Sequence, residues 1–91
     1  MSSIRIYTGQ RCSDCRRAKQ FLSERGVQFE EINIDESRGA EEIVIKANDG
    51  RRVIPTFELD GEFFSVSPFN AYILAEKFNV PLNPVPSNTG G

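Results

Sequence analysis

The chain has 91 residues, which is enough for one domain with a single modest core. Its 11 basic and 13 acidic residues leave a formal net charge of −2, so we expect neither nucleic acid nor an anionic membrane surface as a partner. The lack of histidine excludes imidazole catalysis, and the lack of a long apolar run or a signal-peptide pattern predicts a cytoplasmic protein.

The first half of the chain predicts a strand, a helix and a second strand. Residues 3–8 alternate between apolar and polar side chains before Gly9, which is typical of a short strand. Residues 13–25 predict an amphipathic helix followed by Gly26 as its C-cap, and residues 27–34 predict a strand. The apolar positions with helical spacing are Cys15, Ala18, Phe21 and Leu22. The apolar side chains of the second strand change parity midway, so either a bulge interrupts it or both of its faces are partly buried.

The second half begins with a predicted helix and a hairpin. Residues 37–48 place several apolar side chains on one stripe and start with Ser37, a favourable N-cap. The Asp-Gly pair at residues 60–61 is the strongest hairpin signal in the chain, and it separates predicted strands at residues 53–59 and 62–66. These two strands are expected to be antiparallel.

A third helix and a tail complete the chain. The helix is expected to begin with Pro68 in its first turn and Ser67 as its N-cap, and to end near Asn79. Its predicted packing stripe consists of Phe69, Tyr72, Ile73, Ala75 and Phe78. Residues 81–91 are rich in proline, glycine and polar residues, which predicts a flexible tail.

The predicted elements follow the order βαβαββα. A strand, a helix and a strand in succession form a right-handed parallel pair. The hairpin has to extend the same sheet, because a lone hairpin is not stable by itself. We therefore predict an α/β fold with a four-stranded mixed sheet and helices on both faces, formed by one domain over residues 1–80.

Two cysteines stand three positions apart in the segment Cys12-Ser13-Asp14-Cys15, which follows the first strand and opens the first helix. The first amide groups of a helix have no partner within it and carry partial positive charge, so a sulfur there is favoured as a thiolate. Cys12 is therefore the expected nucleophile. Cys15 lies one turn further on the apolar face, where burial suits it to the resolving step. Three basic side chains add positive charge nearby, which Asp14 opposes: Arg11, Arg16 and Arg17.

Four interpretations of the cysteine pair compete. A structural disulfide would close almost the shortest possible loop and would be kept reduced in the cytosol. A zinc site needs four ligands where the chain offers two cysteines, so we predict no metal site. An iron-sulfur cluster would need two chains or external thiols. A redox dithiol needs only two sulfurs at a helix start beside a βαβ pattern, and we favour it.

These features resemble the glutaredoxins and their thioredoxin-fold relatives over residues 3–79. The likeness rests on the cysteine motif, the later Val53-Ile54-Pro55, the hairpin and the stretch of residues 26–35. It implies a thioredoxin-like fold and a glutaredoxin-type thiol-disulfide oxidoreductase without a tightly bound cofactor, acting as a monomer. Its implied partners are disulfide-containing proteins or glutathione mixed disulfides, with glutathione or a thioredoxin-reductase type of protein as reductant. The alternatives are a dimer that binds or delivers an iron-sulfur cluster through Cys12 and glutathione, and an adaptor that has lost the chemistry.

The resemblance also implies roles for individual residues. Cys12 and Cys15 would be catalytic, and the Ile54-Pro55 peptide bond would be cis and offer the backbone of Ile54 to a substrate chain. Arg52 would hold a carboxylate of glutathione. The expected substrate-binding residues are Arg11, Arg52, Ile54, Pro55 and Ser67.

Two departures from the family pattern affect the expected substrate. Residues 65–69 stand where glutathione-using members carry a Gly-Gly pair and acidic residues, and Asp14 stands where an aromatic residue is usual. A carboxylate at that position repels anionic glutathione unless Arg11 or Arg16 neutralises it. These departures resemble the small glutaredoxin-like proteins that take electrons from thioredoxin reductase and serve ribonucleotide reductase.

Overall fold

The computed structural model describes residues 3–83. Its elements over that range are β1 (Ile4–Thr8), α1 (Ser13–Glu24), β2 (Glu30–Asn33), α2 (Arg38–Ala47), β3 (Thr56–Leu59), β4 (Glu62–Ser65) and α3 (Ala71–Phe78). This is the βαβαββα order predicted from the sequence.

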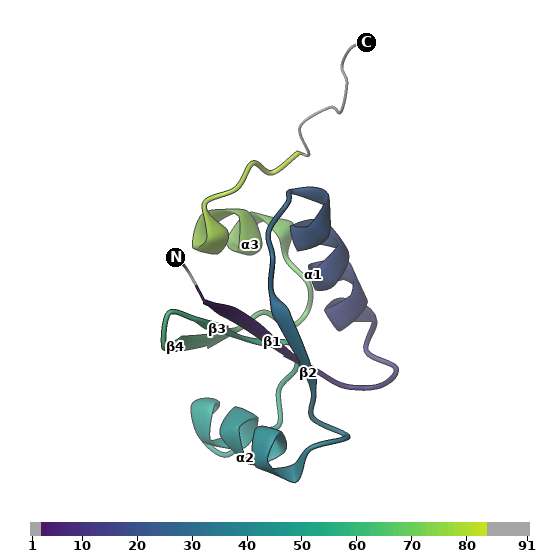
Figure 1. Ribbon diagram of the computed structural model, residues 1–91, viewed down its shortest axis with the longest axis vertical. Coiled ribbons are helices and arrows are strands. Elements are labelled where there is room, and N and C mark those ends of the chain that lie inside the picture. Colours follow the sequence, from purple (N-terminus) through teal and green to yellow (C-terminus); the bar gives the residue numbers. More distant parts are fainter. Residues whose placement is uncertain (1–2, 84–91) are drawn as a thin grey trace.

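The strands form one mixed sheet in the order β2-β1-β3-β4. β1 is parallel to β2 and antiparallel to β3, and β3 and β4 form the antiparallel hairpin. Helices α1 and α3 lie on one face of this sheet and α2 lies on the other (Figure 1). Since β1 and β2 run parallel with Thr8 opposite Asn33, their carboxyl ends meet at the same edge of the sheet.

The central strand β1 is buried from both sides. Ile6 is fully buried and faces α1 and α3, while Tyr7, which is 2% exposed, faces α2. The larger apolar cluster consists of Ile6, Ala18, Phe21, Leu22, Phe57, Val66 and Leu74. The smaller one consists of Tyr7, Ile34, Ala40 and Val44. The loop that carries the cysteines thus extends from the most enclosed strand of the sheet.

The second strand is shorter than predicted, and apolar side chains in and next to it are partly buried on both faces of the sheet. Its register with β1 is continuous from Glu30 to Asn33, so no bulge interrupts it. Phe29 packs against the larger cluster and Ile32 against the smaller one, which explains the change of parity in the sequence. Val27 belongs to the turn that ends α1 and not to the strand. Its amide donates to the carbonyl of Leu22, and the preceding residue, Gly26, has a φ of 74°.

The predicted start of the third helix is wrong, and its packing stripe is only partly right. Phe69, Ala75 and Phe78 pack against the larger cluster as expected. Asn70, not Ser67, is the N-cap of α3, because its side-chain oxygen accepts the amide of Ile73 at 3.1 Å. Pro68 lies before the helix, after a cis Ser67-Pro68 bond. With the start at Ala71, the face that packs on the core consists of buried Leu74 and the partly buried Ala71, Ala75 and Phe78. Tyr72 is 74% exposed and Ile73 is 39% exposed, although both were expected to pack.

The second helix and the hairpin agree with the sequence. The hydroxyl of Ser37 accepts the amide of Ala40 at 3.3 Å, which caps α2. Asp60 and Gly61 both have positive φ values, 51° and 90°, as an Asp-Gly hairpin turn requires. β3 begins at Thr56 rather than at residue 53, because the side chain of Thr56 donates back to the carbonyl of Val53 and the chain turns there.

The guanidinium of Arg25 joins the end of α1 to the segment after α3. It donates to the carbonyl of Pro81 at 2.7 Å and also to that of Leu82. The remainder of the predicted tail, residues 84–91, lies outside the described residues. Between residues 3 and 83, none of the helices combines the length and apolar character that crossing a membrane requires.

Candidate active site

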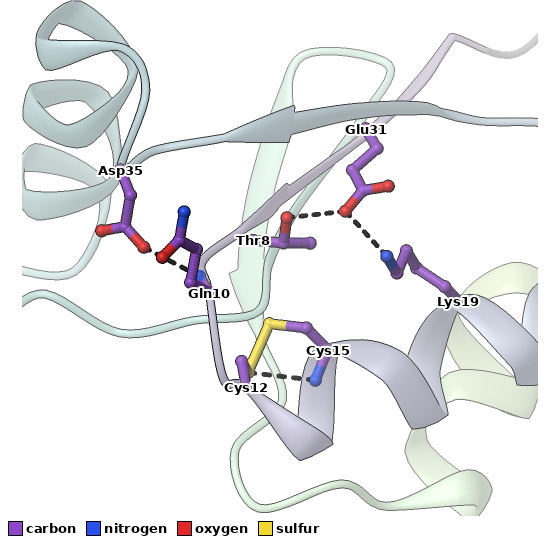
Figure 2. Close-up of polar contacts among 7 residues, drawn as sticks. All are labelled: Thr8, Gln10, Cys12, Cys15, Lys19, Glu31 and Asp35. Carbon is purple, nitrogen blue, oxygen red and sulfur yellow. Dashed lines mark hydrogen bonds and ion pairs between the residues drawn. A yellow bond between two sulfur atoms is a disulfide. The ribbon is translucent and has the colours of Figure 1, made fainter.

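The two cysteines are joined by a disulfide at the start of α1 (Figure 2). Their Cα atoms are 5.2 Å apart. Cys12 is the N-cap of the helix, and its Sγ accepts the backbone amide of Cys15 at 3.1 Å. Cys12 is partly exposed, whereas Cys15 is 2% exposed and faces the core. Cys12 is therefore the more accessible cysteine and has its sulfur at the amide end of the helix, whereas Cys15 is shielded from solvent.

The segment before Pro55 lies against the loop that leads to Cys12. The Ile54-Pro55 bond is cis, as the family resemblance implied. A Cβ added to Gly9 would lie 2.7 Å from Cδ1 of Ile54, so the two segments approach closely enough that any larger residue would require Ile54 to move. The carbonyl of Pro55 accepts the amide of Val66 at 3.4 Å, which brings in the segment between β4 and α3.

Arg52 is held by two carboxylates of the protein itself. Its guanidinium lies 2.6 Å from Asp35 and 2.8 Å from Glu41. The other oxygen of Asp35 accepts the backbone amide of Gln10 at 2.8 Å (Figure 2). Asp35 thereby joins the segment before Pro55 to the loop before Cys12.

The sequence analysis did not predict these ion pairs of Arg52. The signal that was available is the parallel pairing of β1 and β2, because the residues that follow two neighbouring parallel strands come together at one sheet edge. Gln10 follows β1 and Asp35 follows β2 by two positions each. The second carboxylate, Glu41, comes from α2 and carries no such signal.

A second polar cluster lies between the sheet and α1. The carboxylate of Glu31 accepts the hydroxyl of Thr8 and the ammonium of Lys19, both at 2.8 Å (Figure 2). The hydrogen bond from Lys19 lowers the pKa of Glu31, and the one from Thr8 adds to this, while partial burial opposes it. Because Thr8 is 1% exposed, this cluster fixes the end of β1 from which the cysteine loop starts.

Asp14 makes a contact that the sequence did not predict. Its Oδ1 accepts the backbone amide of Phe69 at 3.1 Å, so this carboxylate ties the cysteine motif to the segment before α3. The predicted substrate-binding residues Arg11 and Ser67 are both exposed. Arg11 adopts a φ of 59° in the turn that leads from β1 into α1.

Across residues 3–83, no three or more cysteine, aspartate or glutamate side chains gather in a way that could hold a metal ion. The polar groups near the dithiol are engaged instead with backbone amides and with basic side chains.

A four-stranded mixed sheet between helices, with a cysteine pair at the first helix start and a cis proline in the segment that packs against the cysteine loop, defines a thioredoxin-fold redox protein. The family model for glutaredoxin matches residues 4–64. Glutaredoxin 3 of Escherichia coli (strain K12) is 39% identical over 62 residues, which cover 68% of this chain and 74% of that protein. Mycoredoxin 1 of Corynebacterium glutamicum is 30% identical over 76 residues, or 84% of this chain and 94% of that protein. The chain belongs to the glutaredoxin family.

Solved structures agree with this assignment. The thioredoxin-like protein BC3987, in its mutant T8A, superposes with a TM-score of 0.73 at 26% identity, covering 85% of this chain and all of that one. The glutaredoxin-like protein NrdH-redoxin from Escherichia coli gives a TM-score of 0.67 at 28% identity, covering 92% and 99%. The chain is therefore a thiol-disulfide oxidoreductase of the glutaredoxin type with a thioredoxin-like fold, as expected from its sequence.

Proposed function

We propose that Cys12 is the attacking thiol and Cys15 the resolving thiol of this oxidoreductase. The observation that carries the proposal is the position of Cys12 at the start of α1. This residue is partly exposed, and its sulfur accepts the backbone amide of Cys15 at 3.1 Å. Helix amides stabilise a thiolate at that point. Cys15, at 2% exposure, is protected from competing disulfides and reaches only the mixed disulfide beside it.

The proposed cycle moves two electrons. The Cys12 thiolate attacks one sulfur of a substrate disulfide, and the other substrate sulfur leaves as a thiolate that takes up a proton. Cys15 then loses its proton and attacks the sulfur of Cys12, which releases the second substrate thiol. The substrate disulfide is reduced to two thiols, and the protein dithiol is oxidised to the Cys12–Cys15 disulfide.

We propose that the substrates are protein disulfides bound along the segment before β3. The cis Ile54-Pro55 bond and the close contact between Ile54 and Gly9 support this, because they place this stretch of backbone next to the cysteine loop. Arg11 and Ser67 are exposed and are proposed to contact the substrate chain. Glutathione mixed disulfides are the alternative substrate.

We propose a reductase-type protein rather than glutathione as the electron donor. Arg52, the residue expected to hold a glutathione carboxylate, already pairs with Asp35 and Glu41. A third carboxylate would be repelled by these two, and only the remaining guanidinium donors of Arg52 are left for an anionic substrate. The similar NrdH-redoxin is described as having a thioredoxin-like activity profile, which agrees with this choice.

We further propose that the protein works as a monomer in the cytoplasm without a bound cofactor. One chain supplies both sulfurs of the cycle, and a reducing compartment returns the disulfide to the dithiol. The iron-sulfur alternative is not favoured, because the chain has two cysteines and a cluster would need a second chain or external thiols to supply the remaining sulfurs.

The roles of the two cysteines are tested with serine variants. We expect Cys12→Ser to abolish the reduction of insulin disulfides, and Cys15→Ser to accumulate a mixed disulfide that is visible by mass spectrometry. Ser23→Ala, an exposed change on α1, is the matched control. Full activity of Cys12→Ser would overturn the assignment.

The electron donor is tested by a coupled assay that follows the loss of NADPH. Oxidised protein receives either thioredoxin reductase or glutathione with glutathione reductase. We expect faster turnover with thioredoxin reductase. Faster turnover with glutathione would contradict the proposed donor while leaving the roles of the cysteines intact.

A further inference from the structure

Asp14 lies between the two cysteines, at the second position of α1. Its side chain is half-buried, and its Oδ1 accepts the amide of Phe69 at 3.1 Å across 55 positions of sequence. A hydrogen bond to a charged acceptor is stronger than one between neutral groups. The carboxylate therefore makes a specific tertiary contact and is not merely a solvated charge in the motif.

The amide that Asp14 binds belongs to the segment between β4 and α3, residues 66–70, which we call the β4–α3 loop. Val66 is 3% exposed and donates to the carbonyl of Pro55. The ring of Phe69 meets that of Phe21 edge-on, with centroids 6.2 Å apart. The loop is thus fastened at one end to the cis-proline segment and at the other to the helix that carries the dithiol.

Asp14 has no substitute in this arrangement. Asn70 uses its side chain to cap Ile73, so the neighbouring polar side chain of the loop is engaged within α3. Without Asp14, the loop loses its hydrogen bond to the dithiol helix and keeps only apolar contacts with it, through Val66 and Phe69 in the larger cluster.

We propose that Asp14 is a positioning residue that fixes the β4–α3 loop against the dithiol and so determines how well disulfides within polypeptides bind. The inference rests on the proposed function, because the loop is bonded through Val66 to Pro55, in the segment proposed to bind the substrate. A small disulfide that touches only the sulfur of Cys12 does not need the loop. The negative charge of the carboxylate also disfavours the ionisation of Cys12. This second effect has to be distinguished from the hydrogen bond by experiment.

Two substitutions separate the hydrogen bond from the charge. Asp14→Asn keeps an oxygen acceptor at the same position and removes the charge, whereas Asp14→Ala removes both. Ser23→Ala is the matched control, because Ser23 is an exposed residue of the same helix outside the cysteine motif. KM and kcat are measured with insulin and with bis(2-hydroxyethyl) disulfide, using the reductant that supports turnover of the wild-type chain.

For Asp14→Ala we expect a KM for insulin roughly 5- to 10-fold above wild type, in line with the net contribution of one hydrogen bond to a partly exposed group. We expect the KM for the small disulfide to stay within about twofold, and the Phe69 amide to exchange with solvent about tenfold faster. For Asp14→Asn we expect a KM for insulin within about twofold of wild type, together with faster alkylation of reduced Cys12 at low pH because the opposing charge is gone. Ser23→Ala should change none of these values by more than about twofold.

Either of two results would overturn the proposal. One is an Asp14→Ala variant whose insulin KM and Phe69 exchange match the wild type. The other is an Asp14→Asn variant that raises KM as much as Asp14→Ala does, since the charge and not the contact would then be responsible. If the wild-type chain reduces neither disulfide, the proposed function fails instead, so the two failures are distinguishable.

Discussion

Replacing Gly9 by alanine tests whether the cysteine loop and the cis-proline segment are as closely packed as the structure shows. The new Cβ would lie 2.7 Å from Cδ1 of Ile54 and 3.2 Å from Oδ2 of Asp35. Ordinary contacts begin at 3.4 Å, so the end of Ile54 has to retreat by 3.4 − 2.7 = 0.7 Å. Asp35 cannot retreat freely, because the same oxygen holds the amide of Gln10.

These contacts set the size of the expected effect. Overpacking a well-filled site costs about 1–3 kcal/mol, and moving Ile54 off its rotamer falls in the lower part of that range. We expect Gly9→Ala to lower the free energy of unfolding by about 1–2 kcal/mol, which for a domain of this size lowers Tm by roughly 4–16 °C. The KM for protein disulfides should rise as well, since Ile54 lies in the segment before β3 that is proposed to bind the substrate.

The assay is urea denaturation, with Gly39→Ala as the matched control. Gly39 lies in α2 with nothing within 4 Å of the added Cβ, so alanine there should stabilise the protein by about 0.5–1 kcal/mol. If Gly9→Ala were as stable as the wild type while the control behaved as expected, the close approach of the two segments would be refuted.

Three further predictions concern stability. Leu74→Ala, in the larger cluster and fully buried, should lower the free energy of unfolding by about 2–5 kcal/mol in urea titrations, and a loss below about 1 kcal/mol would contradict its place in the core. Burial and the hydrogen bond to Glu58 raise the pKa of Tyr7 above 10.0, so its contribution to stability is present below pH 10 and is lost as the pH rises through the raised value. Tyr7→Phe should therefore flatten the alkaline end of the stability profile, and an unchanged profile would contradict this. The hydrogen bond from Lys19 lowers the pKa of Glu31 below 4.5, so its contribution is present above that pH and is lost as the pH falls through the lowered value. Because Glu31 is 40% exposed, Lys19→Met should cost well under 1 kcal/mol at pH 7 and nothing at pH 2, and an equal loss at both would refute the ion pair.

The parts of the fold that sequence predicted are those with local causes. Ser37 caps α2 three residues ahead of the amide it accepts, and Asp60-Gly61 carries its turn geometry within two residues. The position of the dithiol is local in the same sense, since Cys12 and Cys15 lie within one turn of helix. Such signals depend on nearest neighbours and are visible in a short window of sequence.

The features that the sequence did not predict depend on partners far away in the chain, or on the residue at which a helix starts. Choosing Ser67 over Asn70 as the N-cap shifted the start of α3 and turned Tyr72 toward the core in the prediction, whereas it faces solvent. Arg52 looked free in sequence, because its partner Asp35 lies 17 positions away. The contact of Asp14 with Phe69 spans 55 positions, and no periodicity signals it.

The unequal apolar clusters on the two faces of the sheet bear on how the protein opens. The cluster beneath α2 has four buried members and the opposite cluster has seven. Local unfolding starts where the fewest apolar contacts are lost, so α2 is the segment expected to open first, while β1 stays closed between both clusters. The cysteines extend from β1, so their exchange chemistry is anchored to the most slowly opening part of the sheet. Thermal damage and proteolysis should accordingly reach α2 before they reach the dithiol.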